Sequence, residues 1–368
     1  MGQKLILTVT NDLTGDQRIH KVAMSLLKAG MEPVLVGRKL PLSLPLNRPY
    51  PCVRLRLLFR KGPMFYVCFN LRLFLYLLFC NADRFLANDL DTLPAVWYAG
   101  RVRRKPVIYD SHEYFTEVPE LVHRPRVRRI WERLEAHIFP KLTRVYTVNE
   151  SIASIYQEKY GVPVGIVRNL PRQDRKEPEP GMVPENFTGC PVILYQGAVN
   201  VGRGLEEIIR AMEHLPEMRL IIVGEGDIRK DLIGLVQTLG VGDRVYLPGR
   251  VPFENLAWYT RQATIGISIE QDIGLNYRYA LPNKLFDYMQ AGLPVLASDL
   301  PEIRRVVEEA QFGTIINRFD PVYLSDTIRS MTKDQEKMQQ WHLNALKSFP
   351  RYTWESQEPT LLSLVSSL

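Results

Sequence analysis

The chain has 368 residues, enough for two domains of ordinary size, and its 46% hydrophobic and 24% charged residues are typical of a globular protein. Its four cysteines (Cys52, Cys68, Cys80 and Cys190) form no CxxC pair, which excludes a disulfide framework or a zinc site and predicts buried thiols in a reducing compartment. The net charge of +7 is uneven, because 26 Lys and Arg stand against 14 Asp and Glu through Asn169 but 21 against 26 after it.

This asymmetry predicts an anionic partner for the first half of the chain. No helix-turn-helix pattern and no basic motif interleaved with aromatic residues accompanies the charge, so we expect no nucleic-acid partner. An anionic membrane surface or a phosphate-bearing acceptor fits the pattern better.

The first half alternates short apolar runs with amphipathic stretches. Strands are predicted at 4–9, 33–37, 84–87, 107–109 and 144–148, and helices at 18–29, 91–101, 127–139 and 151–160. The opening apolar run is too short for a signal peptide, so we expect a cytoplasmic protein. Residues 65–80 are the most apolar stretch but are too few to span a bilayer. A helix buried against the sheet is the favoured interpretation, and a helix lying on a membrane surface is the alternative.

The second half has the same organisation after a Pro-rich, charged stretch at 171–184, which is predicted to be a linker. Strands are predicted at 192–195, 219–223, 244–247, 265–269, 295–297 and 313–316, separated by helices. Such alternation indicates two α/β domains, each a doubly wound parallel sheet. The predicted domains are residues 1–170 and 185–350, with a C-terminal helix at 351–368 that packs back at the domain joint.

Glycine-rich turns follow two strands of the second half. The loop at 197–204 begins with Gly197 and precedes a helix, whose free N–H groups favour an anion, but it matches neither a P-loop nor a dinucleotide fingerprint. A NAD-dependent enzyme is therefore disfavoured. In the second turn, Glu225 stands between two glycines, and Asp227 is predicted to be the N-cap of the next helix.

The segment LPNKLFDYMQAGLP at 281–294 is the most informative. Pro282 is predicted to start a helix whose first turn holds Asn283 and Lys284, so that N–H groups and a cation together meet a diphosphate. Asp287 lies three residues later on the same helix face, where its carboxylate can bind a ribose diol. The alternative is an exposed ion pair between Lys284 and Asp287. We favour a nucleoside-diphosphate site.

Together these motifs resemble family 4 glycosyltransferases, also called group 1 or glycogen-synthase-like, of the bacterial surface-glycan type, over nearly the whole chain. PNKLFDYMQAGLPVLAS at 282–298 is similar to the family's P-x-K-x-x-E-x-M-x-x-G-x-P-V element. VGEGD at 223–227 resembles its G-x-G turn, and YQGAVNVGRGLEEII at 195–209 resembles the start of its donor domain. The resemblance implies an α/β GT-B fold, in which two Rossmann-like domains face each other across a cleft.

The resemblance also implies roles for individual residues. The implied donor-binding residues are Gly197, Arg203, Glu225, Arg250, Val251, Asn283, Lys284 and Asp287. The implied catalytic residues are His112, Glu270, Arg203 and Lys284. The implied acceptor-binding residues are Asn11, Asp12, Asp16, Arg18, Asp89, Asp91 and Asp110, in loops that follow strands of the first half. The Asp-x-Asp at 89–91 is interpreted as helix N-caps or acceptor ligands rather than a metal site, and His112 has a purely structural role as its alternative.

The chain departs from the family pattern at three places. Tyr279 stands where the family has the first acid of a paired-glutamate motif, so Glu270 or Asp272 is expected to replace that acid. In the first glycine loop only one cation, Arg203, matches the family's usual pair. A polar loop at 11–18 replaces the family's N-terminal glycine-rich loop.

We therefore expect a retaining, hexosyltransferase-like enzyme that moves a sugar from a nucleoside-diphosphate-sugar to a glycan or lipid-linked acceptor, without a metal or another cofactor. We expect it to act in cell-surface polysaccharide biosynthesis, in the cytoplasm or peripherally on the inner membrane face. The alternatives are a GT-B nucleotide-sugar epimerase, which would use the donor without an acceptor, and a non-catalytic subunit that binds a glycan or a nucleotide.

Overall fold

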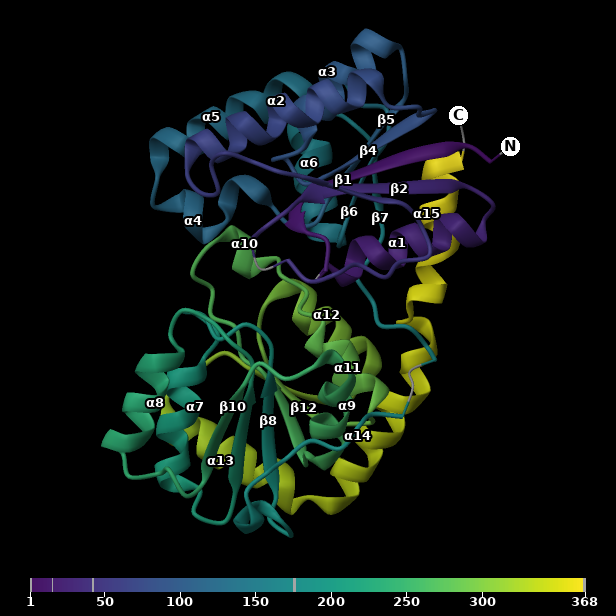
Figure 1. Cartoon of the computed structure of the whole chain (residues 1–368). Helices are drawn as coiled ribbons and strands as arrows, with labels where there is room; N and C mark the ends of the chain where they lie inside the picture. Colours follow the sequence, from purple (N-terminus) through teal and green to yellow (C-terminus); the bar gives the residue numbers. More distant parts are fainter. Residues whose placement is uncertain (1, 15, 42, 175–176, 367–368) are drawn as a thin grey trace. The chain divides into compact units, whose positions relative to one another are not determined.

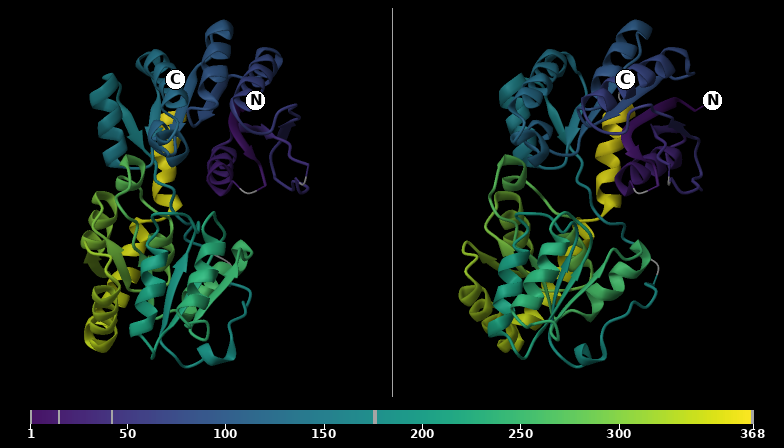
Figure 2. Two further views of the ribbon diagram at one scale, coloured as in Figure 1. Left: turned by 90° about the vertical axis from the view of Figure 1, so that its left-hand side faces the viewer. Right: turned by 60° about the vertical axis from the view of Figure 1, so that its left-hand side comes forward.

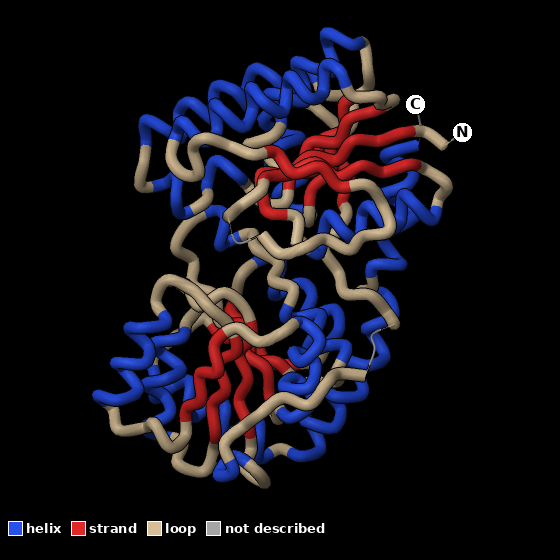
Figure 3. The backbone as a smooth tube through the Cα atoms, viewed as in Figure 1, coloured by secondary structure: helices blue, strands red, loops and turns tan. Residues whose placement is uncertain are grey.

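The computed structural model describes residues 2–14, 16–41, 43–174 and 177–366. The chain forms two compact units, the first made of Met1–Asn169 with Gln357–Leu368 and the second of Leu170–Ser356. Each unit has one parallel β-sheet with helices on both faces (Figure 1, Figure 3). The two Rossmann-like domains that the sequence predicts are therefore confirmed.

The first unit has a seven-stranded sheet in the order β3-β2-β1-β4-β5-β6-β7, in which all neighbours are parallel. The strands are β1 (Lys4–Asp12), β2 (Glu32–Arg38), β3 (Cys52–Leu55), β4 (Arg84–Asn88), β5 (Val107–Ser111), β6 (Val145–Thr147) and β7 (Val164–Ile166). The central strands β1 and β4 are buried over most of their length, as expected of a parallel sheet covered on both faces. The strand order reverses between β1 and β4, and open parallel sheets bind ligands at the carboxyl ends of such strands.

Three helices of the first unit, α2, α3 and α5, form a layer on one face of the sheet, while α1 lies on the other (Figure 1). The helices are α1 (Gln17–Lys28), α2 (Pro63–Phe79), α3 (Leu93–Arg103), α4 (Pro119–Val122), α5 (Pro125–Ile138) and α6 (Glu150–Tyr160). Within the layer, the rings of Tyr66 and Trp131 join α2 to α5, with centroids 5.3 Å apart. Arg103 of α3 donates to the carbonyl oxygens of Leu77 and Cys80 at 2.7 Å each, which satisfies the end of α2.

The most apolar stretch of the sequence forms α2, and only one face of this helix is buried. The buried face consists of Phe65, Phe69, Leu73 and Leu77. The opposite face exposes Met64, Val67, Leu71, Leu75 and Phe79, each with an exposed fraction between 48% and 86%. The favoured prediction of a buried helix thus holds for half of the helix surface. Among the described residues, no helix is long and apolar enough to span a membrane.

The second unit has a six-stranded parallel sheet in the order β10-β9-β8-β11-β12-β13. The strands are β8 (Val192–Gln196), β9 (Arg219–Val223), β10 (Val245–Gly249), β11 (Ile265–Ser268), β12 (Val295–Ser298) and β13 (Gly313–Ile316). The strand order reverses between β8 and β11. Two apolar cores flank this sheet, one on each face. Successive residues of β8 point to opposite faces, so Ile193 belongs to one core and Leu194 to the other.

Helices cover both faces of the second sheet. They are α7 (Leu205–Ala211), α8 (Arg229–Thr238), α9 (Phe253–Gln262), α10 (Leu275–Arg278), α11 (Lys284–Gln290), α12 (Pro301–Ala310), α13 (Pro321–Lys333) and α14 (Gln335–Ser348). The Pro-rich stretch before β8 belongs to this unit and packs on α9. The hydroxyl of Tyr259 in α9 accepts a hydrogen bond from the backbone N–H of Met182 at 3.3 Å and donates one to the carbonyl oxygen of Met182 at 3.1 Å.

The last helix, α15 (Trp354–Ser366), belongs to both units. Its first residue, Trp354, is fully buried and donates its backbone N–H to the carbonyl oxygen of Pro171 at 2.7 Å. From Gln357 onward the helix clusters with the first unit, where Arg144 donates to the carbonyl oxygen of Leu364 at 2.9 Å. Figure 2 shows this helix in yellow, ending beside the strands of the first unit.

Candidate functional site

Glycine turns close the carboxyl ends of three neighbouring strands in the second unit. Gly197 after β8 and Gly224 after β9 have φ angles of 140° and 149°, which residues with a side chain rarely adopt. A Cβ atom on Gly224 would lie 1.8 Å from the carbonyl oxygen of Gly197. The backbone N–H of Gly224 also donates to the carbonyl oxygen of Gly249, which ends β10, at 2.9 Å. These turns therefore form one closely packed backbone edge.

A group of three charged side chains, two of them buried, lies beside this edge. Lys284, the first residue of α11, places its Nζ 2.6 Å from Glu270 Oε1, and Arg203 Nη1 lies 3.5 Å from the same oxygen. Glu270 follows β11, is fully buried, and accepts a second hydrogen bond from Ser268 Oγ at 2.7 Å. We call Arg203, Glu270 and Lys284 the charged triad. It stands at the ends of β8 and β11, between which the strand order reverses, and this is where open α/β sheets bind ligands.

Two tyrosines hold the cations of the charged triad. Lys284 Nζ lies 3.9 Å from the ring centroid of Tyr195, and Arg203 Cζ lies 4.9 Å from that of Tyr277. Both hydroxyls donate to the glycine loop that carries Arg203, Tyr195 to the carbonyl oxygen of Ala198 at 2.6 Å and Tyr277 to that of Val201 at 2.9 Å. The rings therefore stabilise the loop and the two cations at once.

The charged triad carries a net positive charge. Burial lowers the pKa of Lys284 to about 8, although Glu270 opposes this effect. Burial also favours the neutral form of Glu270, but the charges of Lys284 and Arg203 outweigh it and hold the pKa of that carboxyl below its usual value. At neutral pH the site thus holds two cations and one carboxylate, and it can receive an anion.

The segment at 281–294 has a different local structure from the one predicted. The N-cap of α11 is Asn283, which is exposed, so Pro282 precedes the helix instead of starting it. Lys284 is 7% exposed and pairs with Glu270, so the alternative of an exposed ion pair with Asp287 is wrong. Asp287 accepts from Gln196 Nε2 at 3.0 Å, and Gln196 Oε1 accepts from Thr260 at 2.9 Å. The carboxylate of Asp287 is thereby oriented by the end of β8.

The remaining donor-side residues lie on the turns after β9 and β10. Glu225 is half exposed and pairs with Arg229 at 3.5 Å, while Arg250 is exposed and Val251 is partly buried. The prediction that Asp227 caps the next helix is wrong, because α8 begins at Arg229 with Ile228 as its N-cap. The backbone N–H of Asp227 instead donates to Asn200 Oδ1 at 3.2 Å, and this contact with the neighbouring loop delays the start of the helix.

The two acids expected to replace Tyr279 have different surroundings. Glu270 is fully buried and belongs to the charged triad, whereas Asp272 is half exposed and pairs with Arg278 at 3.6 Å. Tyr279 is the C-cap residue of the short helix α10.

The polar residues predicted in the first unit meet at the carboxyl ends of β1, β4 and β5. Asp110 is fully buried and accepts from Arg18 Nη2 at 2.8 Å and Nε at 3.2 Å. His112 lies between two carboxylates, with Nε2 3.0 Å from Asp110 and Nδ1 3.1 Å from Asp89. Burial lowers the pKa of His112, but these carboxylates outweigh it and hold that pKa well above its ordinary value. His112 is therefore a cation that donates from both ring nitrogens.

Asp89 and Asp91 do not cap a helix, so that part of their interpretation is wrong. The N-cap of α3 is Thr92. Asp89 has a φ of 61°, in the left-handed region. Its carboxylate accepts a hydrogen bond from the backbone N–H of His112 at 2.8 Å. Asp91 accepts from Thr10 Oγ1 at 2.5 Å, and burial raises the pKa of Asp91 to about 7. Among the described residues, no group of three or more His, Cys, Asp and Glu side chains is arranged to hold a metal ion.

The other residues predicted in this loop have structural partners. Asp16 caps α1 by accepting from the backbone N–H of Ile19 at 3.1 Å, and Asn11 donates to Asp16 at 3.3 Å. Asp12 pairs with Arg54 at 3.6 Å.

Sequence reasoning missed the two tyrosines and Gln196. The available signal was Gln196, a polar residue at the end of an otherwise apolar buried strand.

Two family models match the chain: "Glycosyltransferase Family 4" at residues 16–171 and "Glycosyl transferases group 1" at residues 183–348. D-inositol 3-phosphate glycosyltransferase from Xylanimonas cellulosilytica is 26% identical over 47% of this chain and 42% of that protein. The chain spans about two fifths of the length of the curated relatives it matches.

Solved structures with low sequence identity share the fold over the whole chain. Sucrose-phosphate synthase from Thermosynechococcus elongatus has a TM-score of 0.78 at 19% identity, covering 99% of this chain and 98% of that one. Anabaena HepE, solved with UDP and glucose, has a TM-score of 0.76 at 14% identity and full coverage of both chains.

Proposed function

Since the chain belongs to the group 1 glycosyltransferases and has a GT-B fold, we propose that it transfers a sugar from a nucleoside-diphosphate-sugar to a glycan or lipid-linked acceptor, with retention of anomeric configuration. The observation that carries this proposal is the charged triad at the strand-order reversal of the second sheet. Preorganised cations at such a position stabilise the charge that develops on a departing diphosphate. The structural neighbour solved with UDP and glucose supports a nucleotide-sugar donor.

In this proposal the charged triad binds the diphosphate. Arg203 and Lys284 contact the phosphate oxygens, and Glu270 positions both cations before the donor arrives. Gly197 has open space beside its backbone, because a Cβ atom placed there would lie no closer than 3.5 Å to any neighbouring atom. A phosphate can occupy this space. Positive charge from these side chains fits a reaction without a bound metal. Asp287, held by Gln196, binds the ribose hydroxyls.

The remaining donor-side residues lie at the same sheet edge and complete the proposed nucleotide site. Asn283 lies beside the diphosphate, and Glu225 lies on the turn after β9. Arg250 and Val251 border the base. The last two residues follow β10, whose end bonds to the turn after β9.

The acceptor side consists of the polar residues at the carboxyl edge of the first sheet. His112 acts there as a cationic hydrogen-bond donor, because both of its ring nitrogens face carboxylates. It is therefore unsuited to be the base that deprotonates the acceptor. In a front-face transfer the bond from the sugar to the diphosphate breaks as the new bond to the acceptor oxygen forms, and the acceptor proton passes to the leaving diphosphate.

We also propose that the protein works peripherally on the cytoplasmic face of a membrane, in cell-surface polysaccharide biosynthesis. The exposed apolar face of α2 supports this proposal. From Pro33 to Ala82 the sequence contains no acidic residue and eight basic ones: Arg38, Lys39, Arg48, Arg54, Arg56, Arg60, Lys61 and Arg72. Exposed apolar side chains flanked by cations are suited to an anionic lipid surface.

Donor-site variants test the proposed function. We expect Arg203→Ala and Lys284→Ala to reduce transfer by roughly 100-fold or more, because each removes charge that stabilises the leaving diphosphate. Lys284→Ala leaves Glu270 buried without its closest partner, so the double variant Glu270→Gln/Lys284→Met serves as a folding control for it. Lys230→Ala, an exposed cation on α8, is the matched control.

Turnover of a nucleotide-sugar panel is measured by release of free nucleotide, with thermal unfolding recorded for each variant. Full activity in both single variants would refute the donor-site assignment. Consumption of donor without any acceptor would favour an epimerase instead, and nucleotide binding without turnover of any donor would favour a non-catalytic subunit. Product stereochemistry, read by NMR, tests retention.

A further inference from the structure

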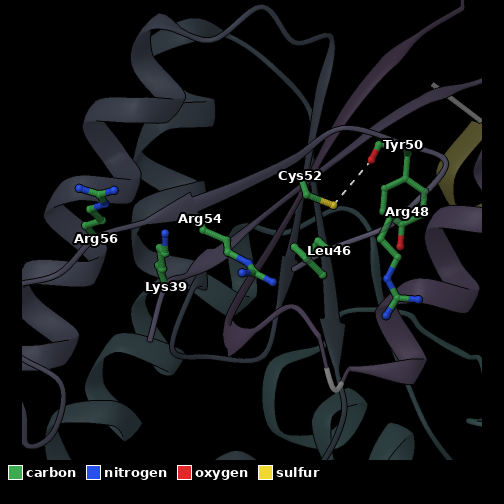
Figure 4. Close-up of a pocket in the computed structure, with 7 residues that line it drawn as sticks. All are labelled: Lys39, Leu46, Arg48, Tyr50, Cys52, Arg54 and Arg56. Atoms are coloured by element: carbon green, nitrogen blue, oxygen red, sulfur yellow. Dashed lines mark hydrogen bonds between the residues drawn. The ribbon is translucent and has the colours of Figure 1, made fainter. Parts of the chain in front are cut away.

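A basic pocket lies on the edge of the first sheet, in a different unit from the charged triad. It is a cavity of about 440 Å³ in which four of the seven lining residues are cations (Figure 4). Its lining residues are Lys39, Leu46, Arg48, Tyr50, Cys52, Arg54 and Arg56. None of these described lining residues is acidic. Its volume is in the range of small-ligand sites.

The fold explains why these cations line one pocket. Cys52, Arg54 and Arg56 alternate along and just beyond the edge strand β3, so their side chains share one face, while Leu55 between them is buried. Lys39 follows the neighbouring strand β2, which pairs with β3 in parallel. Arg48 comes from the connection between these strands, whose end is held by a 2.7 Å hydrogen bond between Tyr50 and His20 of α1.

The positive charge of this pocket is only partly balanced. Arg54 pairs with Asp12 at 3.6 Å and donates from Nη2 to the carbonyl oxygen of Leu44 at 2.7 Å, yet its Nε is buried and has no hydrogen-bond partner among the described residues. In the part of the chain that the structure describes, no carboxylate lies within ion-pair distance of Lys39, Arg48 or Arg56. A buried donor without an acceptor, such as Arg54 Nε, is costly, and an oxyanion would satisfy it while neutralising the charge of the exposed Lys39 and Arg56.

We propose that this pocket binds a phosphate or diphosphate group of the acceptor. Asp12, which pairs with Arg54, also ends β1, so the pocket is continuous with the sheet edge that carries the acceptor-side residues. Naming the ligand as the acceptor rests on the proposed function, whereas oxyanion binding by the pocket does not. The phosphate can come from a lipid headgroup or from a soluble phosphate ester, and both present the same oxygens to the cations.

Charged residues on an edge strand also have a simpler role, since they prevent sheets from pairing edge to edge. That role explains Arg54 and Arg56 on β3. It does not account for Lys39 and Arg48, which line the same pocket from other segments. The experiment therefore separates oxyanion binding from edge protection.

The test is calorimetric titration of the full chain with inorganic pyrophosphate. The double variant Lys39→Gln/Arg56→Gln removes two exposed cations that have no ion-pair partner among the described residues, and it should leave the fold intact. We expect it to weaken pyrophosphate binding in the first unit by at least ~10-fold, because charge-assisted hydrogen bonds are lost. Arg60→Gln/Lys61→Gln, with the same change in net charge in the same acid-free segment, should have no such effect.

A second pyrophosphate site is expected at the charged triad, so all titrations are repeated in an Arg203→Ala background. Persistence of the pocket site there, with transfer lost, supports both proposals independently. If Arg203→Ala changes nothing while the pocket variant loses binding, the proposed function fails and the pocket stands. If the pocket variant binds like its control, or only aggregates more, the pocket proposal is overturned.

Vesicles distinguish the two sources of phosphate. Phosphatidylcholine vesicles containing phosphatidic acid are mixed with the wild type and with both double variants. Loss of vesicle binding in the pocket variant beyond that in its control indicates a lipid headgroup. Loss of soluble pyrophosphate binding alone indicates a soluble phosphate ester.

Discussion

At the scale of single residues, the charged triad explains how a basic site stays folded before its ligand arrives. Lys284 is only 7% exposed, and an isolated buried ammonium group would cost several kcal/mol. Glu270 offsets part of that cost through a 2.6 Å contact, and Arg203 restores the net positive charge. The carboxylate therefore positions the cations without cancelling them.

This arrangement makes nucleotide binding depend on pH. Burial lowers the pKa of Lys284 to about 8, and only the protonated amine attracts a diphosphate. As the pH rises through about 8, the free protein loses this proton, so affinity should fall by up to ~10-fold per pH unit. Calorimetry with a nucleoside diphosphate at a series of pH values measures the step.

Two variants show whether Lys284 causes that step. Lys284→Met should bind weakly with no step near pH 8, whereas Arg203→Ala should bind weakly and keep one. A wild-type affinity that stays constant from neutral pH to about pH 10 would contradict the lowered pKa of Lys284.

At the scale of elements, α2 carries large apolar side chains on two opposite faces although only one of these faces packs. Its inner face fills the space over the sheet, and its outer face leaves five large apolar side chains in contact with water. The neighbouring helix α3 extends this surface with exposed Tyr98 and Val102, and neither helix contains an acidic residue. A surface of this kind is suited to a partner that takes up apolar side chains.

We expect the outer face of α2 to bind anionic vesicles. The variant Val67→Ser/Leu71→Ser changes two exposed positions, so it should keep the fold and reduce binding to phosphatidylglycerol-containing vesicles by roughly 10-fold, from lost apolar burial. Leu343→Ser/Leu346→Ser on α14 removes two exposed leucines of the second unit as the control. Sedimentation with vesicles at low and high salt is the measurement. Absence of vesicle binding by the wild type at both salt concentrations would refute the proposal.

Elements also show how far sequence reasoning reaches. Continuous apolar runs such as β8 predicted the two parallel sheets correctly. A strand that is covered on both faces buries every side chain, so its sequence is apolar throughout instead of alternating. The caps expected of Asp89, Asp91 and Asp227 were wrong, since tertiary contacts override local capping preferences there. The pairing of Lys284 with Glu270 could not be read from the segment 281–294, because it depends on how β11 and α11 are placed beside each other.

At the scale of the whole molecule, each unit has its own sheet and core, and α15 contributes to both. Trp354 is fully buried in the second unit, while Leu361 and Val365, from the part of the helix that clusters with the first unit, are also fully buried. Arg84 and Arg144 of the first unit donate to carbonyl oxygens of the last helical turns. The first unit thus depends on residues that follow the second in the chain.

Leu361→Ala should therefore destabilise the first unit selectively. Removing a fully buried leucine side chain costs about 2–5 kcal/mol, whereas Leu343→Ala, at an exposed position of α14, should change stability by less than ~0.5 kcal/mol. Hydrogen exchange of individual peptides across a urea titration resolves the two units. Peptides of the first sheet should lose protection at a urea concentration lower by roughly 1 M or more, and those of the second sheet should not shift. Equal shifts in both sheets would instead mean that α15 couples the units into one cooperative fold, because its first turn is anchored in the second core.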